Sequence, residues 1–368
     1  MPKRGNNIYK RKDGRWEGRY VKGRANGKTA FGYVFAPTYT AAKEKLAIAK
    51  QIWKADCEAK DRKNTTLGVV SERWLEDSKA FLKESTIAKY RDYLSCYILP
   101  KFGESTFGEM STESIAVFFR KLLTEGGAGR KGLSARTVSE VRCILKILQK
   151  YAVRQGCHAN FSLDVLEMKQ KEKPIRIFNE QEQERLRSYL NDAMTPCHMG
   201  ILLCLSTGIR LGELCALRWD DISLSSKELH IRRTMQRIRD ASGVQSRTKI
   251  VITSPKSGSS IRTIPLPDSI CSRLRPFYQG DAFLLTGDRE RFVEPRTMQN
   301  RFKGVLEKCG IANANFHALR HTFATRCVEA GFDAKCLSVI LGHSNVNITF
   351  NRYVHPTMEM KRRNMEKL

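Results

Sequence analysis

The chain has 368 residues, with 65 Lys and Arg against 38 Asp and Glu, and hence a formal net charge of +27. This length exceeds one ordinary domain, and a 41% hydrophobic content is enough for buried cores, but no segment is apolar for long enough to cross a bilayer. Because Lys and Arg replace the counterions condensed on a phosphate backbone, the charge favours a nucleic-acid partner over a merely basic protein or an anionic membrane surface.

Two further features concern the compartment. The basic start, Met1 to Gly5, is followed by no apolar stretch, so we expect no secretory signal. The eleven cysteines are odd in number, dispersed and without a C-x-x-C pair. This usage indicates buried thiols in a reducing compartment, without a disulfide framework or a metal cluster. We therefore expect a cytoplasmic protein that binds no metal.

Residues 1–62 are predicted to form a small basic domain of three strands and one helix. Between residues 1 and 60 there are 15 Lys and Arg against 5 Asp and Glu. The turn signals Asp13-Gly14 and Asn26-Gly27 separate three runs of strand-forming residues. The runs are Asn7–Arg11, Arg15–Lys22 and Thr29–Phe35, and a helical pattern follows from Thr40 to about Lys60.

Alternation within these strands separates aromatic from basic side chains. Trp16 and Tyr20 share one side of the second strand, and Arg15 and Arg19 share the other. In the third strand Phe31, Tyr33 and Phe35 share a side. We expect an aromatic face packed on the helix and a free basic face in the DNA major groove, with Arg15, Arg19, Arg24 and Lys28 as contacts. A charged sheet that only aids solubility is the alternative.

Residues 65–160 are predicted to form a helical bundle, because their apolar positions repeat with a period near 3.6. The predicted helices are Leu67–Leu82, Ile87–Ile98, Ile115–Leu123 and Val138–Val153, with Ser or Thr at their starts. A Gly-rich basic loop, residues 126–132, adds Arg130 and Lys131 as candidate DNA contacts. A protein-interaction module would show the same pattern. The charged stretch Glu167–Ile175 predicts a linker.

The final domain, residues 175–368, is predicted to be mainly helical with alternating strands at Glu228–Arg239 and Lys249–Pro265. The expected fold class is thus a multidomain, mainly α chain. It combines an N-terminal three-stranded β-sheet plus helix, a helical-bundle middle domain and a mixed α+β domain at the C-terminal end.

Four local sequences in the final domain carry reactive groups. Residues 207–214 are T-G-I-R-L-G-E-L, and residues 255–265, P-K-S-G-S-S-I-R-T-I-P, place Lys256 at the mouth of a predicted hairpin. Residues 317–321 are H-A-L-R-H, and L-G-H at 341–343 precedes Tyr353.

Taken singly, each of these sequences has an ordinary explanation. Arg210 can pair with Glu213 one turn on, and Tyr353 can be a packing residue. His317 and His321 lie four residues apart, which suits a metal, but further ligands are missing. No single motif decides the function.

Together, in this order and spacing, the motifs resemble the tyrosine recombinase (phage integrase) family, similar to integrases of conjugative transposons. The shared pattern is an Arg in T-G-x-R-x-x-E-L, a hairpin Lys, an H-x-L-R-H box, an L-G-H box and a Tyr about ten residues later. The corresponding residues here are Arg210, Lys256, His317, Arg320, His343 and Tyr353. By resemblance, residues 65–160 are a core-binding domain, 1–62 an arm-type DNA-binding domain and 175–368 the catalytic domain.

The chemistry of phosphodiester cleavage explains this set of groups. Arg210 and Arg320 would hold the non-bridging phosphate oxygens, because a guanidinium binds them in a bidentate manner and keeps its charge. Tyr353 would be the nucleophile, with His317 as its base. We expect His343 to donate to the phosphate, Lys256 to protonate the leaving oxygen and Glu213 to orient Arg210, and we expect His321 to be structural.

The resemblance also implies partners and a product. The product is a 3′-phosphotyrosyl link to double-stranded DNA, at core and arm-type sites, in a bacterial cytoplasm. No cofactor is expected, because the bond energy is kept in the link and the chain lacks a G-x-x-x-x-G-K-[ST] loop. We expect a homo-tetramer on DNA in which the tail Thr357–Leu368, released at Pro356, packs on a neighbouring protomer. Accessory excision or bending factors belong to the same resemblance.

Two other functions fit much of this pattern. A non-catalytic DNA-binding regulator would have the same charge and N-terminal domain, and a type IB topoisomerase would run the same chemistry without partner exchange. The complete catalytic set argues against the first function, and the N-terminal domain with the L-G-H box argues against the second.

Overall fold

A computed structural model describes residues 7–25, 28–127, 129, 131–167, 175–192, 194–240, 248–255, 258–353, 362 and 365–366, with side chains for all of these except 23–25, 28 and 55–63. The chain forms two compact units, Met1–Lys171 and Glu172–Leu368. It is mainly helical with small antiparallel sheets, which confirms the expected fold class. No helix within the described residues is both long and apolar enough to span a membrane.

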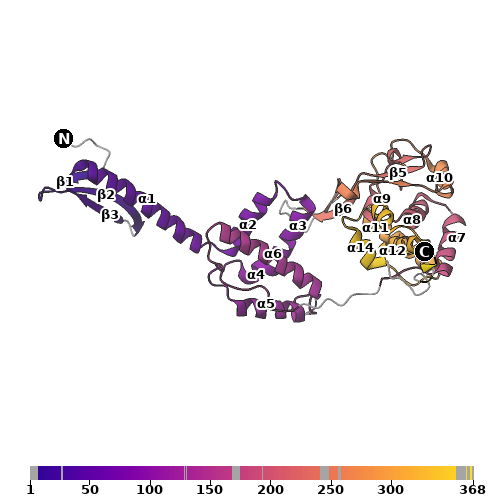
Figure 1. Cartoon of the computed structure of the whole chain (residues 1–368), viewed down its shortest axis with the longest axis horizontal. Coiled ribbons are helices and arrows are strands. Elements are labelled where there is room, and N and C mark those ends of the chain that lie inside the picture. Colours follow the sequence, from indigo (N-terminus) through magenta and orange to yellow (C-terminus); the bar gives the residue numbers. More distant parts are fainter. Residues whose placement is uncertain are drawn as a thin grey trace. The chain divides into compact units, whose positions relative to one another are not determined.

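The N-terminal part of the first unit is an antiparallel sheet with the order β1–β2–β3. Its elements are β1 (Ile8–Lys10), β2 (Trp16–Ala25), β3 (Lys28–Ala36) and the helix α1 (Tyr39–Lys63). Helix α1 lies along one face of the sheet (Figure 1). These bounds agree with the predicted strands and helix to within a few residues.

The two faces of this sheet differ from the expectation in one respect. Trp16, Tyr20 and Val34 pack on the core beneath α1, as the pattern of the second strand predicts. However, Tyr33 lies opposite Arg19 and is 51% exposed. Residues paired across antiparallel strands point to the same side, so the third-strand aromatics share the face of the arginine. The expectation that Phe31, Tyr33 and Phe35 pack on the helix is therefore wrong, since the smaller side chains of β3 fit beneath α1.

The rest of the first unit is a helical bundle around one apolar core. Its helices are α2 (Leu67–Ser78), α3 (Glu84–Tyr93), the π-helical turn η1 (Leu94–Ile98), α4 (Leu99–Phe102), α5 (Thr112–Glu125) and α6 (Ala135–Arg154). Three of them begin at hydroxyl caps, as expected from Ser or Thr at their starts: Thr66, Ser111 and Ser134 each accept a hydrogen bond from the backbone three residues on. The turn η1 precedes Pro100, whose missing N–H prevents a regular helical pattern there.

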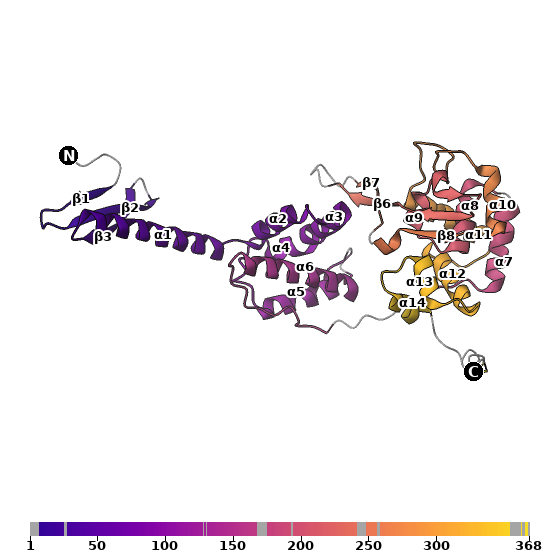
Figure 2. The same cartoon turned by 45° about the horizontal axis from the view of Figure 1, so that its top comes forward.

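The second unit is larger and carries the four motif sequences. Figure 2 labels most of its helices. Its helices are α7 (Glu180–Asp192), α8 (Pro196–Thr207), α9 (Leu211–Cys215), α10 (Asp268–Leu274), α11 (Pro295–Lys308), α12 (His317–Glu329), α13 (Ala334–Leu341) and α14 (Val346–Tyr353). The short 3₁₀ turns are η3 (Trp219–Asp221), η4 (Gly258–Ser260) and η5 (Arg275–Phe277). The strands are β4 (Ile222–Ser223), β5 (Glu228–Ile231), β6 (Thr234–Arg239), β7 (Thr248–Thr253) and β8 (Arg262–Pro265).

The two predicted strand regions each divide into two strands that belong to different sheets. One sheet has the order β4–β5–β8, and the other pairs β6 with β7. The first region breaks at Arg232 and Arg233, where the guanidinium of Arg233 bonds Asp221 at 2.7 Å. The break allows β5 and β6 to enter separate sheets.

Helix α8 lies at the centre of the main core, with its residues from Met199 to Leu205 all buried. Such a helix, apolar on all sides, must be covered all round, and α7, α11 and α12 pack against it. A smaller cluster joins α12 and α13 to Tyr353. The C-terminal ends of α8 and α13 are both left-handed glycines, Gly208 and Gly342, at φ +65°.

Candidate functional site

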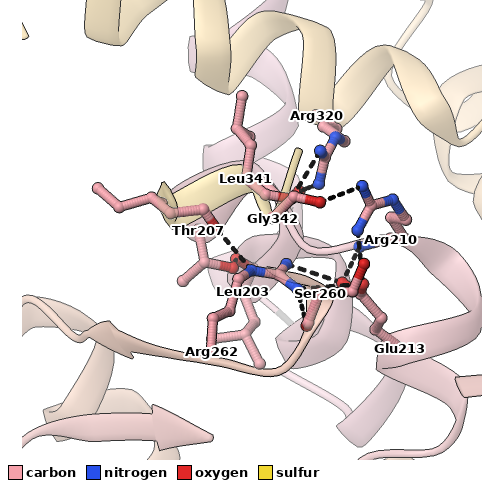
Figure 3. A network of polar contacts seen from close by, with 11 residues as sticks. Leu203, Thr207, Arg210, Glu213, Ser260, Arg262, Arg320, Leu341 and Gly342 are labelled. Atoms are coloured by element: carbon pink, nitrogen blue, oxygen red, sulfur yellow. Dashed lines mark hydrogen bonds and ion pairs between the residues drawn. The ribbon is translucent and has the colours of Figure 1, made fainter. Parts of the chain in front are cut away.

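The candidate site is built at the C-terminal end of α13, where three consecutive carbonyl groups receive three arginines. Arg262 Nε donates to the carbonyl of Ile340 at 2.6 Å. Arg320 Nη2 donates to that of Leu341 at 2.8 Å, and Arg210 Nη2 to that of Gly342 at 2.9 Å. Figure 3 shows the guanidinium groups converging on this turn. The last carbonyls of a helix lack partners within it and carry partial negative charge, so cations are stabilising here.

Arg320 is held by the ends of two helices at once. From the first half of α12 its Nη1 also donates to the carbonyl of Gly208 at 2.8 Å, and the whole residue is 2% exposed. Burial, and then the nearby charge of Arg210, lower its pKa to about 9. The group is therefore a cation at neutral pH that is only partly compensated. A bound anion would stabilise it further.

Arg210 lies directly before α9 and is fixed by Glu213. Its backbone N–H donates to Glu213 Oε2 at 2.9 Å, and its Nη1 donates to Glu213 Oε1 at 2.8 Å. Its side chain is 34% exposed. Only two guanidinium bonds are formed among the described residues, so three of the five N–H donors of Arg210 are left for a ligand.

Glu213 joins two arginines in one buried ion network. Arg262 donates to both of its oxygens, from Nη1 at 3.1 Å and from Nη2 at 2.8 Å. Burial by itself raises the pKa of Glu213, but the bonds from Arg262 and the charges of Arg262 and Arg210 outweigh it and leave that pKa below its ordinary value. Glu213 is therefore an ionised carboxylate that holds the head group of Arg210 in place.

The sequence did not single out Arg262, although a signal for it exists. Arg262 and Ile264 alternate with exposed residues in β8, so an arginine occupies a core-facing position. A buried arginine needs acceptors, and a carboxylate in another motif would be the first candidate.

Tyr353 ends α14 and is 6% exposed within the small core cluster of α12 and α13. Its Oη lies 2.7 Å from Nδ1 of His321. Burial raises the pKa of Tyr353, and the guanidinium groups of Arg320 and Arg352 act in the opposite direction. The phenol is thus protonated at neutral pH, but it lies among cations that would stabilise its anion.

Three histidines surround this tyrosine in different ways. The ring of His343 is parallel to that of Tyr353 with centroids 6.5 Å apart, and its Nδ1 lies 2.8 Å from Thr349 Oγ1. His317 meets His321 edge to face at 4.7 Å. Among the hydrogen bonds of the described residues, Tyr353 Oη is bonded to His321 and not to His317. The contact with His321, expected to be structural, is thus the direct one.

All three imidazoles are neutral at neutral pH. Burial, followed by the charges of Arg352 and Arg320, lowers the pKa of His321 to about 4. Burial and the charges of Arg320 and Arg210 lower the pKa of His343 to about 3. His317 is exposed on one side. Burial of its other side, followed by the effects of His321 and Arg320, lowers the pKa of His317 as well.

The remaining predicted residues lie elsewhere or outside the described part of the chain. Lys256 and Arg130 fall outside the described residues, as do the side chains of Arg24 and Lys28. The same holds for the predicted tail 357–368 except residues 362, 365 and 366. Arg15 and Arg19 have exposed side chains in or beside the N-terminal sheet, where Arg19 lies over the rings of Tyr9 and Tyr33. Lys131 is exposed in its loop.

The chain is similar to two protein families and to individual relatives. The profile of the "Phage integrase family" matches residues 176–360, and that of "Phage integrase, N-terminal SAM-like domain" matches residues 66–123. A "Tyrosine recombinase XerC-like" protein of Caldanaerobacter subterraneus subsp. tengcongensis is 28% identical over 338 residues, which cover 84% of each chain. The "Transposase from transposon Tn916" of Enterococcus faecalis is 27% identical over 219 residues, 53% of this chain and 52% of that protein.

The structure is also similar to solved structures. That of the Tn1549 transposon integrase, in complex with a circular intermediate DNA, matches with a TM-score of 0.65 at 21% identity, covering 82% of this chain and 99% of the other. At this identity the likeness establishes the fold. The family profile spans half of the chain and includes the four motifs that converge on the arginine-bound turn. The chain therefore belongs to the phage integrase family of tyrosine recombinases, which cleave and rejoin DNA.

Proposed function

We propose that this chain integrates and excises a mobile DNA element by site-specific recombination, with Tyr353 as the nucleophile. The observation that carries the proposal is a buried phenol next to the charges of Arg320 and Arg352, while Arg210, fixed on the same turn as Arg320, keeps donors for a ligand. A DNA phosphate is the ligand that matches these groups, because its two non-bridging oxygens gain negative charge in the transition state.

In the proposed reaction each group acts on one part of the phosphodiester. Tyr353 Oη attacks phosphorus, and the bond to the 5′ oxygen breaks to leave a 3′-phosphotyrosyl link. Arg210 and Arg320 stabilise the charge on the non-bridging oxygens, with His343 as a further donor from its unbonded nitrogen. Lys256 protonates the leaving 5′ oxygen. A 5′-hydroxyl of the partner strand then attacks the link and releases Tyr353.

The mobile-element assignment is supported by the kind of relative that this chain resembles. Both the Tn916 transposase and the Tn1549 integrase are proteins of transposons. We infer that the substrate is the joined ends of such an element together with a target duplex, and that accessory excision or bending factors set the direction.

The first unit is proposed to bind the DNA on either side of the cleavage site. Residues 65–160 would hold the core site, and the exposed face of the β1–β3 sheet, with Arg15 and Arg19, would enter a major groove at arm-type sites. The interleaved aromatics on this face, Tyr33 among them, hold the arginine head groups by cation–π contacts. Preordered arginines lose less entropy when they bind phosphate.

Recombination of two duplexes cuts four strands, and each chain contributes one Tyr353, so we propose a homo-tetramer on DNA. Ile348 and Phe350 of α14 and Val339 of α13 are large apolar side chains exposed to solvent. The occupant that we propose for them is the segment Thr357–Leu368 of a neighbouring chain. Deleting this segment should reduce the DNA-bound complex from four chains to fewer in mass photometry. An unchanged tetramer with unchanged recombination would contradict tail exchange.

The proposed function is tested by comparing the full chain with Tyr353→Phe. The probe is a nicked duplex selected for binding from the DNA that flanks the coding sequence. We expect the wild type to form an SDS-resistant protein–DNA adduct and the variant to form none while it retains its gel-shift affinity. If the wild type binds the probe tightly but yields no adduct, the chain is a regulator and not a recombinase.

A second assay separates recombination from topoisomerase activity. On plasmids that carry two copies of the selected site, a recombinase exchanges the intervening segment. A type IB topoisomerase relaxes supercoils equally well with one site or none. Relaxation without exchange, in the presence of host extract to supply accessory factors, would favour the topoisomerase.

A further inference from the structure

The imidazole of His321 is hydrogen-bonded to the hydroxyl of the nucleophile. Tyr353 Oη and His321 Nδ1 are 2.7 Å apart, within the range of a well-formed hydrogen bond. The ring planes are inclined at 50° with centroids 5.7 Å apart, so the contact is made by the polar atoms and not by stacking. His321 is the residue that follows Arg320 on α12, and the phosphate-binding cation and the partner of the nucleophile are therefore fixed by the same turn of helix.

We infer that His321 is the proton acceptor for Tyr353 in DNA cleavage, and that its Nδ1 takes the phenolic hydrogen as the oxygen attacks phosphorus. The inference deepens the proposed function and rests on it. In the tautomer with hydrogen on Nε2, the lone pair of Nδ1 faces the hydroxyl. The O–H bond of Tyr353 breaks, an N–H bond forms on His321, and the oxygen–phosphorus bond replaces the bond to the 5′ oxygen. In the rejoining step the imidazolium returns the same proton to the departing phenolate, so no outside acid or base is consumed.

The surrounding charges make this base responsive to substrate. His317 and Arg320 face His321 from α12, Arg352 and Tyr353 face it from α14, and His343 flanks the phenol from the turn after α13. Without DNA, burial and then the charges of Arg352 and Arg320 keep the imidazole neutral, and burial keeps the proton on Tyr353. A phosphate between the guanidinium groups adds negative charge next to the ring, which raises the basicity of His321. The tyrosine is thus activated when a phosphodiester occupies the site.

His317 is less suited to the same task in this arrangement. It meets the ring of His321 edge to face, the hydrogen bonds of the described residues include none from it to the phenol, and one of its sides is exposed. Its edge-to-face contact fixes the orientation of the His321 ring. We therefore assign His317 to positioning and His321 to proton transfer.

The test compares adduct formation by the full chain and three variants on the selected duplex, with sulfur in place of the scissile 5′ oxygen. A thiolate leaves without an acid, so the rate reports on the attack of Tyr353 alone. We expect His321→Ala to lower this rate by about 10²-fold or more, the usual contribution of a general base. His321→Asn places an amide where Nδ1 was, which can keep a hydrogen bond but cannot accept the proton, and should be as slow. His230→Ala, which removes a comparable imidazole–hydroxyl contact to Thr263, should retain the wild-type rate.

A second measurement separates proton transfer from positioning. Replacing Tyr353 by 3,5-difluorotyrosine lowers the pKa of the phenol and reduces its need for a base. In the His321→Ala background this replacement should recover at least about tenfold of the rate, because general-base effects of about 10²–10⁴ shrink as the nucleophile becomes more acidic. If His321→Asn restored the adduct rate while difluorotyrosine did not raise the rate of His321→Ala, His321 would be a positioning residue. That result would overturn the inference. A wild-type rate in His321→Ala, with none in Tyr353→Phe, would do the same and leave the proposed function intact.

Discussion

Removing the carboxylate of Glu213 should both destabilise the second unit and disable Arg210. Glu213→Ala leaves the guanidinium of Arg262, whose side chain is 3% exposed, without its counter-ion. An uncompensated buried charge of this kind costs about 3–5 kcal/mol. In a unit of this size that corresponds to a fall of about 6–20 °C in the melting temperature. Arg210 loses a bond to its backbone N–H and a bond to its Nη1 at the same time.

The assay for Glu213 is urea unfolding of the full chain, with the transition of the second unit followed by Trp219 fluorescence. Arg262→Met should also destabilise this unit, but the double variant Glu213→Ala/Arg262→Met should cost about 1–3 kcal/mol less than the sum of the single changes, because the two residues are in direct contact. Asp281→Ala is the control, since the Asp281 side chain is 53% exposed and its pair with Arg218 contributes less than about 1 kcal/mol. A cost for Glu213→Ala no larger than that of Asp281→Ala would refute the account of a buried network.

Three further predictions follow from other parts of the structure. The lowered pKa values of His321 and His343 mean that the unfolded chain takes up protons below pH 6.5 that the folded chain does not, so stability should fall from pH 7 to pH 5. The free energy of unfolding should fall by about 2 kcal/mol over this range, after halving for solvent access. The double variant His321→Asn/His343→Asn should show a smaller pH dependence of stability, and an unchanged dependence would contradict the prediction. Gly208→Ala should lower the melting temperature more than Gly331→Ala does, although both glycines have positive φ. At Gly208 the new Cβ would lie 2.5 Å from the ring of Phe323, whereas at Gly331 no atom lies within 4 Å. Equal losses of stability would refute the clash. Arg19→Ala should weaken binding to the selected duplex and reduce the slope of log affinity against log salt by about one, as the loss of one phosphate contact requires, and an unchanged slope would remove Arg19 from the interface.

Much of the fold follows from local patterns, and the departures have physical causes. The helical bundle of the first unit was predictable because apolar spacing and hydroxyl caps act within a few residues of each other. The face of the third strand was not, because period-two alternation identifies residues that share a side and not which side is covered. The cross-strand register, with Tyr33 opposite Arg19, decides that question.

The candidate site shows the same division. The order of the motifs predicted that Arg210, Arg320 and Tyr353 belong together, and the fold brings both arginines to the end of α13. Contacts set by tertiary packing were not predictable from spacing. His321 and His317 lie four residues apart on one helix, and only the approach of α14 determines which of them meets the phenol.

The central claim is that the phenol of Tyr353 becomes bonded to DNA. Its most direct test is mass spectrometry of the trapped adduct after digestion with protease and nuclease. We predict a single nucleotide-bearing peptide, with a 3′-phosphate ester on the oxygen of Tyr353. A nucleotide on another side chain, or adduct-free protein under conditions of complete binding, would contradict the account.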